Sequence, residues 1–204
     1  ASSPDPMTNL DAFIDALPKA ETHIHIEGTV PWSIARHYAT DATEPDWLHP
    51  DFRFTDFDQF GSAMMLGVLH LQHDSLRHYA DVAAACFRHL AAQNVRYVEV
   101  TLGMGPILRG DAADPAEVVA AVHAAAPAGM HVRVIGGVNR RFVHPLDGPE
   151  ARAVLDTPGI VGIDLQSDER ANGPCAFTDL YDAARERGSL LRAHAGALSG
   201  QQLI

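Results

Sequence analysis

The sequence predicts an α/β protein in which parallel strands alternate with helices. Segments with a strand pattern recur five times, segments with one apolar helical face lie between them, and the two kinds alternate throughout the chain. Alternation of this kind implies parallel strand pairing with right-handed crossovers. The chain therefore contains five β/α steps, whereas a closed α/β barrel has eight.

The length of the chain limits the number of domains. At 204 residues it is long enough for one well-buried domain and too short to suggest two. We place this single domain at residues 7–204. A complete eight-stranded α/β barrel takes about 250 residues, so the chain is short for one. Residues 1–6 precede a plausible initiator, Met7, and we interpret them as a cloning remnant outside the fold.

Charge and composition exclude several classes of partner. The formal net charge is −11, and Arg140 and Arg141 form the only adjacent pair of basic residues, so a nucleic acid polymer is not an expected partner. No run approaches the roughly 20 apolar residues that span a bilayer, and the N-terminus lacks a signal pattern, so no membrane association is expected. Cys86 and Cys175 have no spacing motif, which favours reduced thiols and a cytoplasmic location.

The first half of the chain predicts one strand and four helices. A helix at residues 8–17 carries one apolar face and is expected to lie across one end of the barrel. A strand follows at residues 21–27. The connection to the next strand is unusually long, and such insertions cover active sites. It contains three helical patterns, at residues 31–39, 56–70 and 75–93. The apolar residues of the middle helix are expected in the core rather than in a substrate lid: Phe57, Phe60, Met64 and Leu66.

The remaining elements alternate without a second long insertion. Asp114 at the N-cap, Pro115 at the first position and Glu117 at the third predict the start of a helix. Gly188 ends another helix, and residues 199–204 resemble the opening of one more. The predicted strands lie at residues 95–101, 131–138, 160–166 and 189–194, and two further helices lie at residues 149–155 and 178–187.

Two histidines one residue apart lie on the first predicted strand. Side chains alternate between the two faces of an extended chain, so His23 and His25 point the same way, as two ligands of one metal ion would. The pair alone is equally consistent with half-exposed histidines at a strand end. Lys19 is the only lysine. A two-metal site that is bridged by a carboxylated lysine on a middle strand is therefore not expected, and a one-metal site is favoured.

Five segments, in order, resemble those of the adenosine deaminase family. LPKAETHIHIEGTV (17–30) is similar to the family's first barrel strand, which carries two zinc ligands, and the resemblance extends from about Leu10 to the last residue. It implies a (β/α)8 TIM barrel of the metal-dependent hydrolase type, with about five β/α units present. The other segments are RYVEVTLGMGPIL (96–108), VRVIGGVNRR (132–141), GIDLQSDE (162–169) and RAHAGALSG (192–200), which matches the family's HAGE segment.

The resemblance implies a reaction and a metal site. His23, His25 and His194 match the positions that hold one Zn²⁺ in the family, where an aspartate from the eighth strand is the fourth ligand. Such an ion lowers the pKa of a bound water toward about 7. The resulting hydroxide attacks carbon 6 of the purine, and ammonia leaves. The implied activity is hydrolytic deamination of an adenine-type purine, either a nucleoside or a base.

One departure from the family affects catalysis directly. Ala197 occupies the position of the glutamate that donates a proton to the ring, and a methyl group cannot transfer a proton. No catalytic residue is intact, so this chain is expected to be inactive or very poor at deamination. The chain could be a truncated enzyme with Glu changed to Ala, which we prefer, a natural half that pairs with a second chain, or a pseudoenzyme. Because strands 1 and 5 would leave open edges, a missing C-terminal half or a second chain is expected.

The resemblance also assigns substrate contacts to His25, Glu27 and Ser167. Glu27 stands where adenosine enzymes have an Asp that contacts the ribose, and Glu here is similar to the adenine and aminofutalosine deaminase branches. The alternative for Glu27 is a loop carboxylate that pairs with an arginine. Ser167 stands where the family often has a Gly whose N–H meets purine nitrogen 3. We interpret Asp164 as architectural and do not assign it to the metal.

The other nine histidines match no ligand motif, and we expect surface or packing roles for them: His37, His49, His70, His73, His78, His89, His123, His131 and His144. Two competing functions stay open. The first is a noncatalytic member of the family that binds a purine or a metal, which Ala197 favours. The second is a different amidohydrolase that cleaves a cyclic amide or ester. The absence of a lysine after the strand with His23 and His25, and the ordered family segments, weigh against this function.

Overall fold

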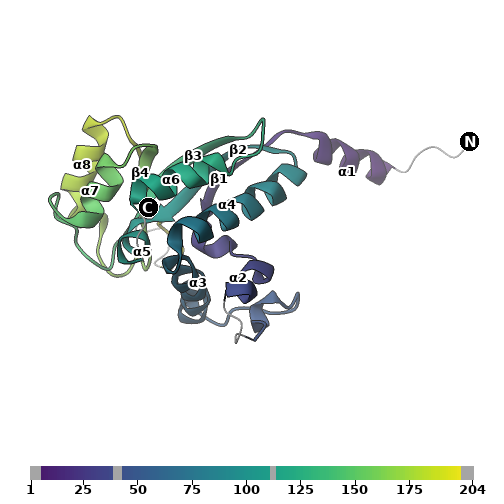
Figure 1. Cartoon of the computed structure of the whole chain (residues 1–204), viewed down its shortest axis with the longest axis horizontal. Coiled ribbons are helices and arrows are strands. Elements are labelled where there is room, and N and C mark those ends of the chain that lie inside the picture. The colour runs from purple at the N-terminus through teal and green to yellow at the C-terminus, as the bar shows by residue number, and fades with distance from the viewer. Residues whose placement is uncertain (1–5, 39–42, 111–113, 199–204) are drawn as a thin grey trace, which may run out of the picture.

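The computed structural model describes residues 6–38, 43–110 and 114–198. These residues form one parallel five-stranded sheet with helices packed outside it (Figure 1). The strands are hydrogen-bonded in their sequence order, β1 to β5. This arrangement is part of a (β/α)8 TIM barrel, as the sequence predicts. The strands are β1 (Lys19–His25), β2 (Val95–Gly103), β3 (His131–Asn139), β4 (Ile160–Gln166) and β5 (Leu190–Ala193).

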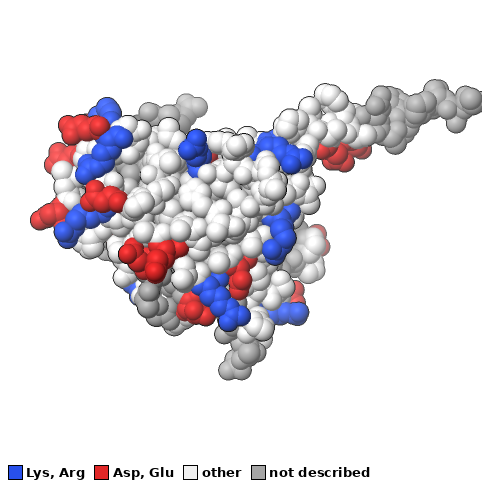
Figure 2. Space-filling view, turned by 45° about the horizontal axis from the view of Figure 1, so that its top comes forward, with Lys and Arg blue, Asp and Glu red and all other residues white. Residues whose placement is uncertain are grey.

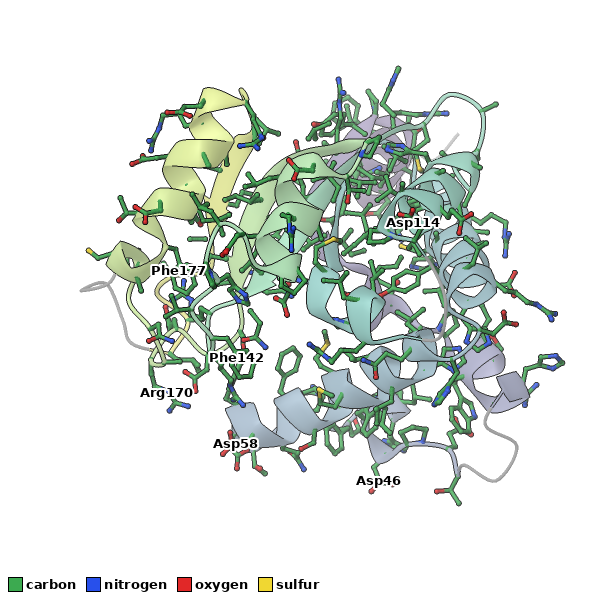
Figure 3. The ribbon with its side chains drawn as sticks, turned by 60° about the vertical axis from the view of Figure 1, so that its left-hand side comes forward. Asp46, Asp58, Asp114, Phe142, Arg170 and Phe177 are labelled. Atoms are coloured by element: carbon green, nitrogen blue, oxygen red, sulfur yellow. The ribbon has the colours of Figure 1, made fainter. Side chains whose placement is uncertain are left out.

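The outer face of the sheet carries the hydrophobic core. Val98, Val100 and Leu102 alternate along β2 and are fully buried in one cluster with Tyr79 and Phe87 of the long helix before β2. This period of two follows from the pleat of the strand. The helices that pack on this side are α4 (Ser75–Ala92), α6 (Pro115–Ala124), α7 (Pro149–Asp156) and α8 (Thr178–Glu186). Asp114 caps α6, because its carboxylate accepts a hydrogen bond from the amide of Ala116 at 2.9 Å (Figure 3).

The inner face of the sheet is polar. Glu99 of β2 forms an ion pair with Arg192 of β5 and accepts a hydrogen bond from the hydroxyl of Tyr97. Arg192 also donates to the carbonyl oxygen of Thr22 in β1 at 2.5 Å. These contacts join three strands one layer below the strand ends. The interior of this half-barrel is therefore built around charges rather than around apolar side chains.

A helical insertion lies at the C-terminal end of β1 (Figure 1). It consists of η1 (Ile26–Thr29), α2 (Trp32–Tyr38), η2 (Asp46–Leu48) and α3 (Phe57–Gln72). Asp56 caps α3, because its side chain accepts a hydrogen bond from the amide of Gln59 at 2.8 Å. Because α3 packs against η1, the insertion is attached next to the residues that directly follow His25.

The five predicted strands are confirmed, with boundaries that differ by at most two residues. β1 ends at His25, so Glu27 belongs to η1 rather than to the strand. A short helix after β2, α5 (Met104–Arg109), was not predicted. The predicted helix at residues 199–204 lies outside the described residues, and the single domain at 7–204 stays a prediction.

The first helix is present, but its expected position is wrong. α1 (Pro6–Ala16) extends away from the sheet instead of lying across one end of the barrel (Figure 1). Leu10, Phe13 and Ile14 on its apolar face are 53%, 58% and 44% exposed. The apolar pattern therefore identified the helix correctly, but it did not identify what the helix packs against.

The face shown in Figure 2 carries charges of both signs. Lys, Arg, Asp and Glu side chains are interspersed toward the sides and the lower margin of this view, and the centre is largely uncharged. Mixed charges of this kind do not produce a strong field of one sign. In the part of the chain that the structure describes, none of the helices combines the length and the hydrophobicity needed to cross a membrane.

Helix α3 approaches η1 most closely at a glycine. A Cβ atom on Gly67 would overlap the carbonyl oxygen of Glu27, whereas a Cβ atom on Gly61 in the same helix would meet nothing within 4 Å. We expect Gly67→Ala to lower the free energy of unfolding by about 1–3 kcal/mol, because a backbone atom cannot move away cheaply. Gly61→Ala should raise it by up to about 1 kcal/mol through helix propensity. Urea unfolding of both variants tests this, and equal stabilisation by the two would contradict the close approach.

The turn after β4 holds a serine in a left-handed conformation. Ser167 has a φ of 84°, a region that disfavours residues with a Cβ atom. We expect Ser167→Gly to raise the free energy of unfolding by about 1 kcal/mol. The control is Ser189→Gly, in the turn before β5, where φ is not positive; it should lower stability slightly by increasing the entropy of the unfolded chain. Thermal unfolding distinguishes the two, and a loss of stability in Ser167→Gly would contradict the strain.

Candidate metal centre

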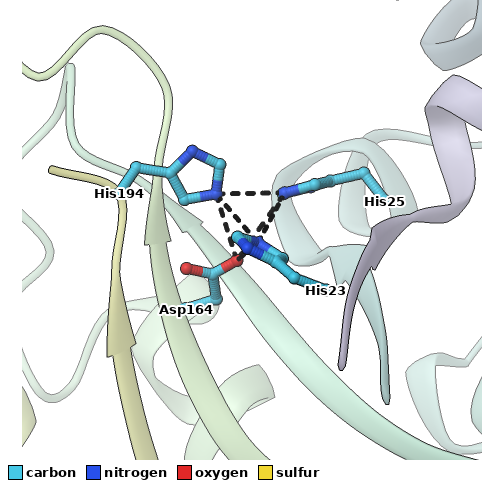
Figure 4. Close-up of side chains that lie close together, drawn as sticks. All are labelled: His23, His25, Asp164 and His194. Carbon is cyan, nitrogen blue, oxygen red and sulfur yellow. Dashed lines mark hydrogen bonds and ion pairs between the residues drawn. The ribbon is translucent and has the colours of Figure 1, made fainter. Parts of the chain in front are cut away.

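Three imidazoles and one carboxylate converge at the C-terminal ends of the strands (Figure 4). The Nε2 atom of His25 lies 3.1 Å from that of His23 and 3.0 Å from that of His194, and the Nε2 atoms of His23 and His194 are 3.1 Å apart. Asp164 Oδ2 lies 3.0 Å from His23 Nε2, 3.4 Å from His194 Nε2 and 3.7 Å from His25 Nε2. The sequence predicts that the three histidines lie close together, and the structure brings them together.

The sheet brings these residues together from distant parts of the sequence. His23 and His25 share the inner face of β1 because side chains alternate along a strand. His194 follows β5 directly, and its amide donates to the carbonyl oxygen of Leu165 in β4 at 2.9 Å. Since all the strands are parallel, their C-terminal ends meet at one edge. The sheet therefore brings the four residues to the same edge.

Asp164 corrects the sequence interpretation, which left this residue out of the cluster as architectural. It lies in the middle of β4 on the same inner face as the histidines, and its side chain is completely buried. Thr101 of β2 donates to Asp164 Oδ2 at 3.3 Å. The pattern of β4 already indicated this position. Ile163 and Leu165 are buried against the outer helices, so Asp164, which lies between them, faces the interior of the half-barrel.

Burial and charge set the protonation states in this cluster. Burial lowers the pKa of His25 to about 4; the other two imidazoles act in the same direction, and Asp164 opposes them. Burial alone would raise the pKa of Asp164, but a hydrogen bond with His194 and the charges of the three imidazoles outweigh it, so this pKa is lowered. A neutral imidazole and an ionised carboxylate are the forms that bind a metal ion.

The four side chains fit a single divalent ion. A neutral imidazole has one N–H, so three mutually facing Nε2 atoms cannot all be satisfied by hydrogen bonds among themselves. Ligands at about 2.0–2.1 Å from a tetrahedral ion lie roughly 3.3 Å from one another, and the distances here run from 3.0 to 3.7 Å. Asp164 Oδ1 is buried and has no hydrogen-bond partner among the described residues. Nitrogen and oxygen donors in this arrangement suit Zn²⁺ or a similar ion.

The remaining histidines form no second centre. In the described ranges, no other group of three His, Cys, Asp or Glu side chains converges as a metal site would require. His78 is buried, stacks on His70 with ring centroids 4.5 Å apart, and contacts the carbonyl oxygen of His70 at 2.9 Å through Nδ1. This pair therefore packs the junction between α3 and α4.

Glu27 lies beside the cluster, in η1, and is buried with 5% of its surface exposed. Its Oε1 atom accepts a hydrogen bond from the amide of Gly103 at 2.7 Å, at the end of β2. The carboxylate therefore bonds to a backbone amide, and no arginine of the described residues forms an ion pair with it, which was the alternative expectation. Burial raises the pKa of Glu27 to about 7, although backbone hydrogen bonds oppose this shift. Its contact with a substrate stays a prediction.

A cavity of about 520 Å³ opens next to Glu27, between η1 and the rest of the helical insertion. Its lining is mainly apolar and includes Trp32, Phe60, Met64 and Leu66. Phe60 and Leu66 are 40% and 51% exposed. The expectation of a core position is therefore wrong for Phe60 and Leu66, which are exposed and line the cavity.

The last two predicted positions lie in loops near the strand ends. Ser167 directly follows β4, and Ala197 is exposed, three residues beyond His194. Asp58 at the start of α3, Phe142 in the loop after β3 and Arg170 in the loop after β4 lie on the same side of the molecule (Figure 3). The insertion and these loops therefore surround the end of the half-barrel that holds the histidines.

Comparison with known proteins agrees with this geometry. The adenosine deaminase family profile matches residues 18–204. An adenine deaminase of Gibberella zeae is 31% identical over 93% of this chain and 59% of its own length. The crystal structure of an adenine deaminase from Arthrobacter aurescens superposes with a TM-score of 0.72 at 28% identity, over 89% of this chain and 58% of that one.

A zinc-bound amidohydrolase structure from Burkholderia ambifaria has the same fold, with a TM-score of 0.67 at 23% identity over 91% of this chain and 54% of that one. The chain thus spans less than two thirds of the proteins it matches. The ordered segments, the half-barrel and the family profile agree with one another. This protein is a member of the adenosine deaminase family.

Proposed function

We propose that this chain provides the metal centre of a purine deaminase, with one Zn²⁺ bound by His23, His25 and His194. The observation that carries this proposal is the convergence of three Nε2 atoms on one point at the strand ends. The buried carboxylate of Asp164 faces the same point and supplies a compensating negative charge. Zinc is supported by the nitrogen-rich donor set and by the zinc in the related Burkholderia structure.

The substrate that we propose is an adenine-type purine, either a base or a nucleoside. Relatives of about 30% identity are named adenine deaminases. The cavity beside Glu27 has mainly apolar walls with a few polar groups, as is typical of sites for flat heteroaromatic ligands. Glu27 is a buried carboxylic acid among the residues that line this cavity, and we assign substrate contacts to it together with His25 and Ser167.

The chain's own residues would act mainly by holding the metal ion and orienting the groups around it. When bound, the metal supplies a water molecule that is acidic enough to act as a nucleophile near neutral pH. His25 is neutral at that pH and can present its lone pair. Asp164 would hold the ion or a molecule bound to it through Oδ2, the oxygen that faces the three Nε2 atoms.

The same site lacks a proton donor at the position that the family uses. Ala197 lies in the segment after His194, and its methyl group can neither give nor take a proton. We therefore propose that this chain as given deaminates poorly or not at all. Ala197 also favours the second candidate function, a family member that binds a purine or a metal without turnover.

The rest of the barrel belongs to the proposal as well. The chain covers 58–59% of the length of the adenine deaminases it matches, and we propose that further polypeptide, in the same chain or in a second one, completes the barrel. The cytoplasmic location that the cysteine usage indicates stays a prediction.

Zinc should stabilise the chain through the histidine cluster. At a free concentration of 100 times Kd, the ion should add about 2.7 kcal/mol to the free energy of unfolding, seen as a rise in the unfolding temperature. His194→Ala should abolish most of this rise, because it removes one of three nitrogen ligands. His89→Ala, an exposed histidine of α4, should leave it unchanged. An equal rise in all three proteins would contradict the assigned ligands.

Activity should depend on a carboxylate at position 197. In the chain together with the polypeptide that completes the barrel, Ala197→Glu should raise the rate of adenine deamination by roughly 10²–10⁴, measured as loss of adenine absorbance. Ala197→Gln has nearly the same shape and no transferable carboxyl proton, so it should not. Adenine binding without turnover in Ala197→Glu would favour the noncatalytic function.

A further inference from the structure

Two buried charged residues that the proposed function does not use hold the segment after β5. Glu169 lies in the loop after β4 and Arg140 follows β3 directly; each is 3% exposed. Neither belongs to the histidine cluster. Both contact residues 194–198, the segment that carries His194 and position 197. Charged side chains this deeply buried are rare unless they make specific hydrogen bonds.

Glu169 binds the backbone on both sides of position 197. Its Oε2 atom accepts a hydrogen bond from the amide of Gly196 at 2.6 Å, and its Oε1 atom accepts one from the amide of Leu198. The two oxygens of one carboxylate thus bind amides that are two residues apart. Gly196 has a φ of 81°, which permits the tight bend that aims both amides at the same carboxylate. The backbone direction at position 197 is fixed by this pair of charge-assisted bonds.

Arg140 binds the same segment at its other end. Its Nη2 atom donates to the carbonyl oxygen of His194 at 2.7 Å, and its Nη1 atom donates to the carbonyl oxygen of Glu169 at 3.4 Å. Two hydrogen bonds fix the main chain of Arg140. Its amide donates to the carbonyl oxygen of Gln166 at 3.0 Å, and its carbonyl oxygen accepts from the side-chain amide of Asn172 at 2.8 Å. The guanidinium group therefore links the loops that follow β3, β4 and β5.

These contacts fix the main chain of His194 on both sides. Its amide donates to Leu165 in β4 and its carbonyl accepts from Arg140. β5 has only four residues and pairs with β4 alone among the described strands, so regular sheet pairing ends where His194 begins. The orientation of the imidazole beyond that point depends on the loop, and the loop depends on Glu169 and Arg140.

We infer that Glu169 and Arg140 are positioning residues that hold His194 toward His23 and His25 and fix the backbone at position 197. The purpose of this positioning rests on the proposed function, since it assumes that the histidines bind a metal. The contacts themselves do not depend on that assumption.

Cobalt binding to the 204-residue chain tests the inference, because the visible absorption of Co²⁺ reports the geometry of its ligands. Glu169→Gln keeps the size of the side chain but replaces one of the two acceptor oxygens with an NH₂ group, which cannot accept a hydrogen bond from a backbone amide. Arg140→Lys keeps the charge but loses the planar fork. We expect each variant to bind Co²⁺ about 10–100-fold more weakly, with a shifted visible band.

Three controls separate positioning from general loss of stability. Asp168→Asn and Arg141→Lys change the neighbouring residues, which make no hydrogen bond to residues 194–198 in the described structure. Val122→Ala weakens the buried core of α6 far from the segment. All three should keep the affinity and the band of the parent chain. Folded Glu169→Gln and Arg140→Lys variants that also keep both would overturn the inference.

Amide hydrogen exchange gives a second test, which needs no metal. The amides of Gly196 and Leu198 should exchange slowly in the parent chain, because each donates to Glu169. Exchange at the rate of an unstructured peptide would overturn the inference. If the parent chain binds no Co²⁺, the proposed function fails, but slow exchange that Glu169→Gln accelerates would still support the role of Glu169 in holding the segment.

Discussion

The parallel pairing of the strands is the constraint on which the site depends. His25 and His194 are separated by 169 positions, yet their Nε2 atoms lie 3.0 Å apart. This proximity arises because β1 and β5 belong to one sheet whose strands all end at the same edge. The sheet also fixes the face on which each side chain lies. A shift of one residue in register would move a histidine of the cluster from the inner face of the sheet to the outer face, among the apolar core residues.

The polar interior has an energetic cost that the cluster partly offsets. Asp164 is completely buried, and ionised groups in such places need partners. Its partners are three imidazoles, two of them from the same strand, and the hydroxyl of Thr101. Below this layer, the ion pair of Glu99 and Arg192 connects β2 with β5. Together with the hydrogen bond from Arg192 to Thr22, this ion pair connects three strands beneath the cluster.

The surrounding elements act on the same end of the half-barrel in different ways. The insertion supplies a cavity with largely apolar walls, and Glu27 is one of the residues that line it. The loops after β3 and β4 supply Arg140 and Glu169, which hold the backbone beyond His194. The cavity and the contacts that hold the backbone beyond His194 are thus formed by separate segments attached to a common sheet.

The sequence by itself determined the alternation of strands and helices, the shared face of His23 and His25, and the family segments that located His194. These features are local: they follow from side-chain periodicity or from motifs. Only the tertiary structure decided that Asp164 joins the cluster, that Phe60 lines a cavity, and that α1 leaves the sheet. Periodicity tells which residues share a face of one element, but not what lies opposite that face. That depends on how elements distant in sequence pack together, and a carboxylate such as Asp164 acquires its role only from the histidines that β1 and β5 bring to it.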